Sequence, residues 1–144
     1  MGDDILIAKA MYTHLNSWPD KPCQIRMETM DKAPIAFSIS IQQLSGTVYL
    51  KKYIDGSFTG AWPFAVYVRL SGNDTAKKFD AVSLLEQLSE WMRVTPPPDI
   101  GSRRTADRIE MTALPSVAGI YEDGGIDYQA IFRLIYKQRS DYNG

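Results

Sequence analysis

The single histidine and the single cysteine are the first side chains to test for chemistry. His14 stands between Thr13 and Leu15 in a stretch with helical spacing, so any Ser–His–Asp triad would have to be built around it. A zinc site would need further ligands at a defined spacing, which the sequence around His14 lacks. Cys23 follows Pro22 at the start of a strand-like run, and a nucleophilic thiol needs a base nearby. We interpret His14 as a surface or interface histidine and Cys23 as a structural thiol, and we expect no catalytic residue.

Two glycine-containing stretches are the remaining candidates for ligand binding. Asp123 and Asp127 flank a Gly-Gly pair, but a calcium loop needs more oxygen ligands and a final glutamate. A hairpin turn explains the same residues. Gly56 and Gly60 are not followed by the Lys-Ser/Thr pair of a phosphate-binding loop. The sequence therefore predicts no metal site, no cofactor and no enzymatic activity.

Basic residues form the first group of candidate contact residues. Arg103 and Arg104 lie in a predicted loop, and Lys51 and Lys52 lie on a predicted strand. Two interpretations stay open for them: charge that only meets solvent, or a positive rim that touches a partner's acids or the DNA backbone. We predict Arg103 and Arg104 as contact residues of the loop.

Three tyrosines form the second group. Tyr49, Tyr53 and Tyr67 project from the faces of their predicted strands that point away from the core. Aromatic side chains are enriched at protein interfaces, and several of them on one sheet face favour a contact between subunits. We therefore predict these tyrosines as interface residues.

The stretch from Tyr53 to Leu70, YIDGSFTGAWPFAVYVRL, organises the elements around these candidates. Asp55, Gly56 and Ser57 are turn residues. An alternation of period two follows and predicts a strand. Its core face holds Trp62, Phe64, Val66, Val68 and Leu70. Pro63 has no N–H to donate, so it marks the strand's entrance, an edge or a bulge.

The other elements are predicted from the same kinds of pattern. An N-terminal helix is capped by Asp3 or Asp4 and carries the stripe Ile5, Ala8, Tyr12 and Leu15, with Met11 beside it. Strands at 24–28, 35–42 and 48–54 have short connections and are expected to be antiparallel neighbours. A second helix begins near Thr75 and is stopped by prolines 96–98. Its stripe is Phe79, Val82, Leu85, Leu88 and Met92.

The last third returns to strands. A strand at 108–113 is broken at Pro115, a short one follows at 117–121, and an uninterrupted alternation runs from 126 to 137. Residues 139–144 are expected to be a frayed tail. This order predicts an α+β fold, with a mixed or mostly antiparallel sheet and two main helices packed on one face.

Composition limits the partners and the compartment. A chain of 144 residues is expected to be one domain, 1–144. The net charge of −1 argues against bulk binding to nucleic acid or to an anionic membrane. One cysteine excludes an internal disulfide and fits a reducing compartment. No apolar run reaches the ~20 residues of a membrane span, and the acidic N-terminus is unlike a signal peptide.

Three segments resemble a known family: YIDGSFTGAWPFAVYVR (53–69), VSLLEQLSEWM (82–92) and DYQAIFRLIYK (127–137). They are similar to the minor capsid proteins of tailed phages or prophages of Gram-positive bacteria, which are similar to tail terminator proteins. The resemblance implies a structural virion protein, made in the bacterial cytoplasm and located in the tail–neck region. It implies a ring, expected to be a hexamer, that caps the tail tube, stops its polymerisation and forms the head–tail joining surface. The implied partners are other copies of the chain, the tail tube protein and a head–neck connector protein, with DNA only as passing cargo and no membrane.

Two alternatives remain beside the terminator. The first is a head-completion or connector protein of the neck, which also belongs to virion assembly. The second is a non-phage, monomeric α+β module that binds a small ligand. The module would have a deep apolar pocket and would not assemble with rising concentration.

Overall fold

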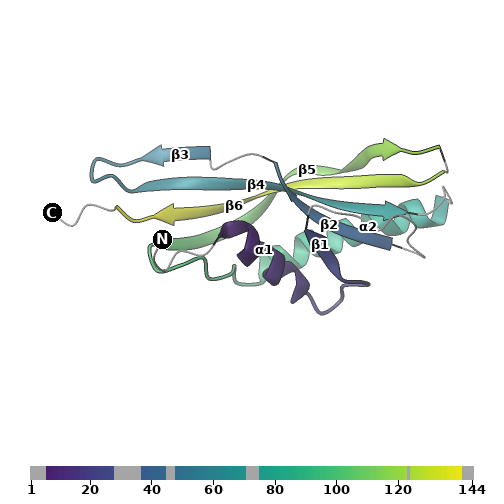
Figure 1. Cartoon of the computed structure of the whole chain (residues 1–144), viewed down its shortest axis with the longest axis horizontal. Helices are drawn as coiled ribbons and strands as arrows, with labels where there is room; N and C mark the ends of the chain where they lie inside the picture. The colour runs from purple at the N-terminus through teal and green to yellow at the C-terminus, as the bar shows by residue number, and fades with distance from the viewer. Residues whose placement is uncertain (1–5, 28–36, 45–47, 71–74, 123, 141–144) are drawn as a thin grey trace.

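The structure is a computed structural model that describes residues 6–27, 37–44, 48–70, 75–122 and 124–140. Two helices and six strands follow one another along the chain (Figure 1). They are α1 (Ile7–Asn16), β1 (Ile25–Met27), β2 (Phe37–Gln43), β3 (Val48–Lys52), β4 (Phe58–Leu70), α2 (Thr75–Val94), β5 (Arg104–Ile120) and β6 (Ile126–Gln138). The strands form one sheet in the order β1-β2-β4-β6-β5, and β3 pairs with β4.

Both helices lie on the same side of the sheet (Figure 1). All strand pairs except β1–β2 are antiparallel. The predicted fold class is therefore confirmed: an α+β fold with a mostly antiparallel sheet and two helices on one face. No helix in the described part of the chain combines the length and the apolar character that crossing a bilayer requires.

The predicted pairing of the first three strands is wrong. β1 runs parallel to β2, and β2 and β3 do not pair with each other. Both instead lie antiparallel along the same edge of β4, β2 from Phe64 to Leu70 and β3 from Phe58 to Ala61. The reason is length: β4 has 13 residues, whereas β2 has seven and β3 five, so two strands fit end to end along it.

Strand β4 forms the centre of the sheet. It pairs with β6 over its whole length, from Phe58 opposite Gln138 to Leu70 opposite Ile126. Alternate residues of β4 enter the core that the helices cover, as the period-two pattern predicts. They are Trp62, Phe64, Val66, Val68 and Leu70.

Pro63 lies inside β4 rather than at its entrance. Its carbonyl accepts a hydrogen bond of 3.2 Å from the Leu44 N–H. In an antiparallel strand the N–H and C=O of one residue point to the same side. The proline nitrogen therefore faces the place where β2 ends and β3 begins, a local edge at which no ladder donor is needed.

Strand β5 is continuous through Pro115, contrary to the predicted break. It runs for 17 residues and forms the outer edge of the sheet beside β6. Its pairing register shifts four times, including once between Ala113 and Ser116. One side of an edge strand has no hydrogen-bond partners, and the bulges of β5 interrupt the hydrogen bonds on its other side. A proline, which lacks an N–H, is therefore tolerated in β5.

The buried stripes of the helices differ in part from the predicted ones. In α1 the buried residues are Ile7, Ala10, Met11 and Leu15, and the predicted caps Asp3 and Asp4 and the stripe residue Ile5 lie outside the described residues. In α2 they are Ala81, Leu85, Leu88 and Met92. Phe79, predicted on the stripe of α2, is 72% exposed. Two residues before Ala81 correspond to about 200° around the helix, so Phe79 points away from the core.

Candidate functional site

The end of the sheet that carries the β3–β4 turn gathers cationic side chains from four segments. Pairing places Lys51, Thr59, Lys137 and Thr105 in one row across the sheet, and Lys52, Phe58, Gln138 and Arg104 in the next. Strands are ~4.8 Å apart, so each row spans about 15 Å from β3 to β5. Two more cations lie beside these rows, Arg103 and Arg139. The Arg139 N–H donates a hydrogen bond of 2.8 Å to the Arg103 carbonyl. Because neighbouring rows point to opposite faces, the six cations surround this end of the sheet. We call it the basic end: Lys51, Lys52, Arg103, Arg104, Lys137 and Arg139.

Tyrosine rings, not carboxylates, lie against the lysines of the basic end. The Nζ atoms of Lys51 and Lys137 each lie 5.3 Å from the centre of the Tyr53 ring. The Nζ atom of Lys52 lies 4.6 Å from the centre of the Tyr49 ring. No described carboxylate lies within ion-pair distance of these three ammonium groups. The rings attract the lysines through their π faces and leave the positive charge open to a partner.

Strand β3 and the turn after it are exposed on both faces. All five residues of β3 are exposed, and Ile54 in the turn is fully exposed. The Asp55 carboxylate accepts hydrogen bonds from the N–H and the hydroxyl of Ser57, and these bonds lower the pKa of Asp55. Gly56 has φ +92°, which favours glycine, and a Cβ there would lie 2.9 Å from the Ser140 Oγ. The turn thus has a defined shape although Ile54 and Asp55 meet solvent; only Ser57 among its described side chains is buried.

The structure brings four of the five predicted contact residues together. Tyr49, Tyr53, Arg103 and Arg104 lie at the basic end. Tyr67 lies eight residues along β4 from Thr59, about 27 Å away. The predicted contact residues therefore do not form one continuous patch.

Two details of that prediction need correction. Tyr49 was expected on the face away from the core, but it packs edge-on against Phe58 at 4.7 Å, on the side of the sheet that carries the helices. The reason is the register, which places Tyr49 opposite Gly60. Arg104 was expected in a loop and is instead the first residue of β5.

At the opposite end of the sheet, a partly buried ion pair connects three segments. The Arg69 guanidinium donates to both carboxylate oxygens of Asp127, at 2.8 and 3.0 Å. The Tyr121 hydroxyl donates to Asp127 at 2.6 Å, and its ring lies 4.9 Å from the Arg69 guanidinium carbon. These contacts raise the pKa of Arg69. The sequence analysis missed this cluster because its members are up to 58 residues apart.

Beside this ion pair the molecule exposes apolar side chains. Val117 is 48% exposed, Ile120 73% and Tyr121 43%. Glu122, in the turn that follows, is also exposed. We call this surface the hairpin end: Val117, Ile120, Tyr121 and Glu122.

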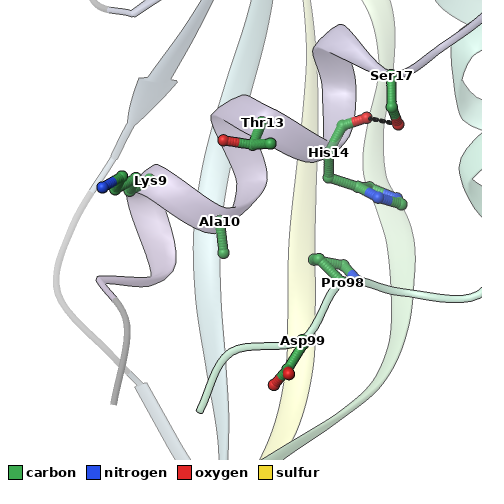
Figure 2. A pocket seen from close by; sticks show the side chains of 7 residues that line it. All are labelled: Lys9, Ala10, Thr13, His14, Ser17, Pro98 and Asp99. Carbon is green, nitrogen blue, oxygen red and sulfur yellow. Dashed lines mark hydrogen bonds between the residues drawn. The ribbon is translucent and has the colours of Figure 1, made fainter. Parts of the chain in front are cut away.

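A groove of about 480 Å³ lies between α1 and the loop after α2 (Figure 2). It is lined by Lys9, Ala10, Thr13, His14, Ser17, Pro98 and Asp99. The His14 ring packs at a tilt of 31° against Trp91, with ring centres 4.9 Å apart, and burial lowers the pKa of His14 below its ordinary value of 6.5. Its Nε2 atom is buried and has no hydrogen-bond partner among the described residues. His14 is thus part of the contact between the helices.

Acid is expected to weaken this contact. Because the pKa of His14 is lower in the folded chain than in the unfolded chain, the unfolded chain binds more protons as the pH falls below 6.5. The free energy of unfolding of the wild type should then fall relative to that of His14→Gln, which cannot titrate. Urea unfolding of both proteins across this range measures the difference. A difference that does not change with pH would contradict the burial of a neutral imidazole.

Cys23 is half-buried, packed against the core, as a structural thiol is. Among the described residues, no three His, Cys, Asp or Glu side chains lie together as metal ligands would. Gly124 has φ +90° in the turn between β5 and β6, as the predicted hairpin requires, and Asp123 lies outside the described residues.

The comparisons with known proteins show a likeness in fold. The sequence matches no protein-family model and no curated protein. Its fold is similar to that of a chain in a solved structure described as "Virion of native gene transfer agent (GTA) particle", with a TM-score of 0.54. The match covers 92% of this chain and 88% of that chain, at 11% sequence identity. The chain therefore shares its fold, over nearly its whole length, with a protein of that virion particle.

Proposed function

We propose that this chain is a structural virion protein, and specifically a tail terminator that caps the tail tube as a ring. The observation that carries the proposal is the fold shared with a chain of a gene transfer agent virion over 92% of this chain. The resemblance of residues 53–69, 82–92 and 127–137 to phage minor capsid and tail terminator proteins supports the same role. The proposed work is assembly, not catalysis.

The surfaces of the molecule suit such a role. A ring made of head-to-tail contacts needs two different surfaces on each subunit. The basic end and the hairpin end lie at opposite ends of the sheet, and both expose aromatic or aliphatic side chains. Exposed apolar groups beside charge are typical of surfaces that bind other proteins. In this proposal the partners are further copies of the chain, the tail tube protein and a neck connector.

The test is to delete the gene from the genome that produces the virions and to measure tail length by electron microscopy. A terminator stops polymerisation, so we expect tails longer than those of the wild type and heads without tails, with normal length restored by the wild-type gene. Tails of normal length that fail to join heads would favour the alternative, a neck connector. Virions that contain no copy of this chain, by mass spectrometry, would refute a virion role.

A further inference from the structure

We infer that the basic end of one subunit binds the hairpin end of a second copy of this chain, so that subunits join head to tail. This inference rests on the proposed function, because it names the surfaces through which the ring would close. The basic end here includes the exposed strand β3 and its turn, and the hairpin end includes the last residues of β5.

The two surfaces cannot meet within one subunit. The row that contains Lys52 and Phe58 is twelve residues along β4 from the row of Leu70, Ile126 and Ile120, a distance of about 40 Å. β3 and β5 also border opposite edges of the sheet. Contacts between two different surfaces repeat from subunit to subunit and close into a ring when the rotation allows.

Both surfaces are incomplete in an isolated chain, because each exposes apolar side chains. At the basic end, Tyr49 is 55% exposed, Leu50 42% and Ile54 fully so. At the hairpin end, Ile120 is 73% exposed and Tyr121 43%. Clusters of this kind on a chain with a well-formed core mark protein contacts. A contact between the two ends would remove both clusters from water together.

Both surfaces also include a strand with a free edge. Within the described part of the chain, no strand pairs with the outer side of β3 or of β5. Free N–H and C=O groups on an edge can pair with a strand of another chain. An edge of one subunit and an edge of the next can therefore continue one sheet across the contact.

Charge favours a second copy as the occupant. The six cations of the basic end and the carboxylate of Asp55 give this end a formal charge of +5. A chain with a net charge of −1 then carries −6 elsewhere. Exposed Glu122 lies next to the apolar residues of the hairpin end. The hairpin end of a second copy thus presents an exposed acid, Glu122, beside apolar side chains to a basic, apolar surface.

The experiment uses one variant of each surface. Ile54→Asp places an acid where Glu122 would approach, and Ile120→Lys places a cation where Lys51 and Lys52 would approach. Both side chains are exposed, so the folds should be unchanged, as thermal unfolding can verify. Val94→Lys changes an exposed apolar residue outside both surfaces and is the matched control. Sedimentation velocity over a concentration series measures the size of the species formed by each protein and by mixtures.

We expect the wild type and Val94→Lys to assemble alike. Each surface variant alone should need a roughly 30-fold higher concentration, the effect of losing an interface hot spot. An equal mixture of the two surface variants should stop at a species of two subunits, because each partner retains only one working surface.

Three results would overturn the inference. One is a surface variant that assembles like the wild type. Another is a dimer formed by each variant alone, which would indicate contacts between identical surfaces. The third is a wild type that stays monomeric at every concentration. None of these results tests the virion role, which the measurement of tail length tests separately. Failure of the contact and failure of the proposed function can therefore be told apart.

Discussion

Replacing Trp62 by alanine is expected to lower the free energy of unfolding by about 3–5 kcal/mol. The Trp62 side chain is only 3% exposed, and it stacks on Phe64 with ring centres 5.2 Å apart. Phe64 in turn stacks on Phe132 of β6 at 5.4 Å. The substitution removes the first ring of this stack and leaves a cavity beside the other two. Because a domain of this kind is stable by roughly 5–15 kcal/mol, the loss should be plain in urea unfolding.

Tyr67→Ala is the matched control for Trp62→Ala, because it truncates an aromatic residue of the same strand on the opposite face. Tyr67 is half-buried, between Ser40 of β2 and Gln129 of β6. Its loss should cost about 1 kcal/mol, the centre of the range for point substitutions in general, because the side chain is half-buried. Equal destabilisation by the two variants would contradict the assignment of the two faces of β4.

Asp127→Ala is expected to cost about 3 kcal/mol. The carboxylate is the shared acceptor for Arg69 and Tyr121, and its side chain is 9% exposed. Removing one member of a buried ion pair leaves the other charge without its partner, at a cost of about 3–5 kcal/mol. The Arg69 side chain is 24% exposed and can reach some water, which places the expected loss at the low end. Chemical unfolding of the variant measures it.

Glu110→Ala supplies the control for Asp127→Ala. Glu110 also accepts from two arginines, Arg108 at 3.0 Å and Arg133 at 2.7 Å, and both interactions lower the pKa of Glu110. The side chains of this group are 33–56% exposed, so the ion pairs are screened by water and should contribute at most about 1 kcal/mol. If both alanine variants lost the same stability, burial would not be what makes the Asp127 cluster strong.

The sequence predicted the central strands well, because their signal is local. The alternation at 126–137 coincides with β6, and that of 62–70 lies within β4 with its core face correctly assigned. Pro115 was misjudged because a proline is tolerated in an edge strand but breaks a central one. The sequence alone does not reveal that β5 is an edge strand. Phe79 was misjudged because the many apolar residues of α2 allow two overlapping stripes, and the buried stripe begins at Ala81.

The sequence identified some residues of the candidate surfaces but not how those residues come together. Tyr49, Tyr53, Arg103 and Arg104 were selected by residue type, and they do lie at one end of the sheet. Their assembly with Lys137 depends on β3, β4, β6 and β5 lying side by side in that order, which is a long-range property. The Arg69–Asp127 pair could likewise be predicted only from knowing that β4 and β6 are neighbours. Its only sequence signal was a charge of each sign on the outward face of two long strands.

The β4–β6 ladder has a geometric consequence for any assembly that joins the two ends of the molecule. These strands pair without a register shift through 13 residue pairs and form one continuous, twisted ladder. β-ladders twist in a fixed, right-handed sense, and the twist accumulates along their length. The rotation of the hairpin end relative to the basic end, about the strand axis, therefore depends on the length of this ladder. In the proposed head-to-tail ring, that angle and the geometry of the contact together set the rotation from one subunit to the next, so lengthening or shortening the ladder would change the curvature of the ring.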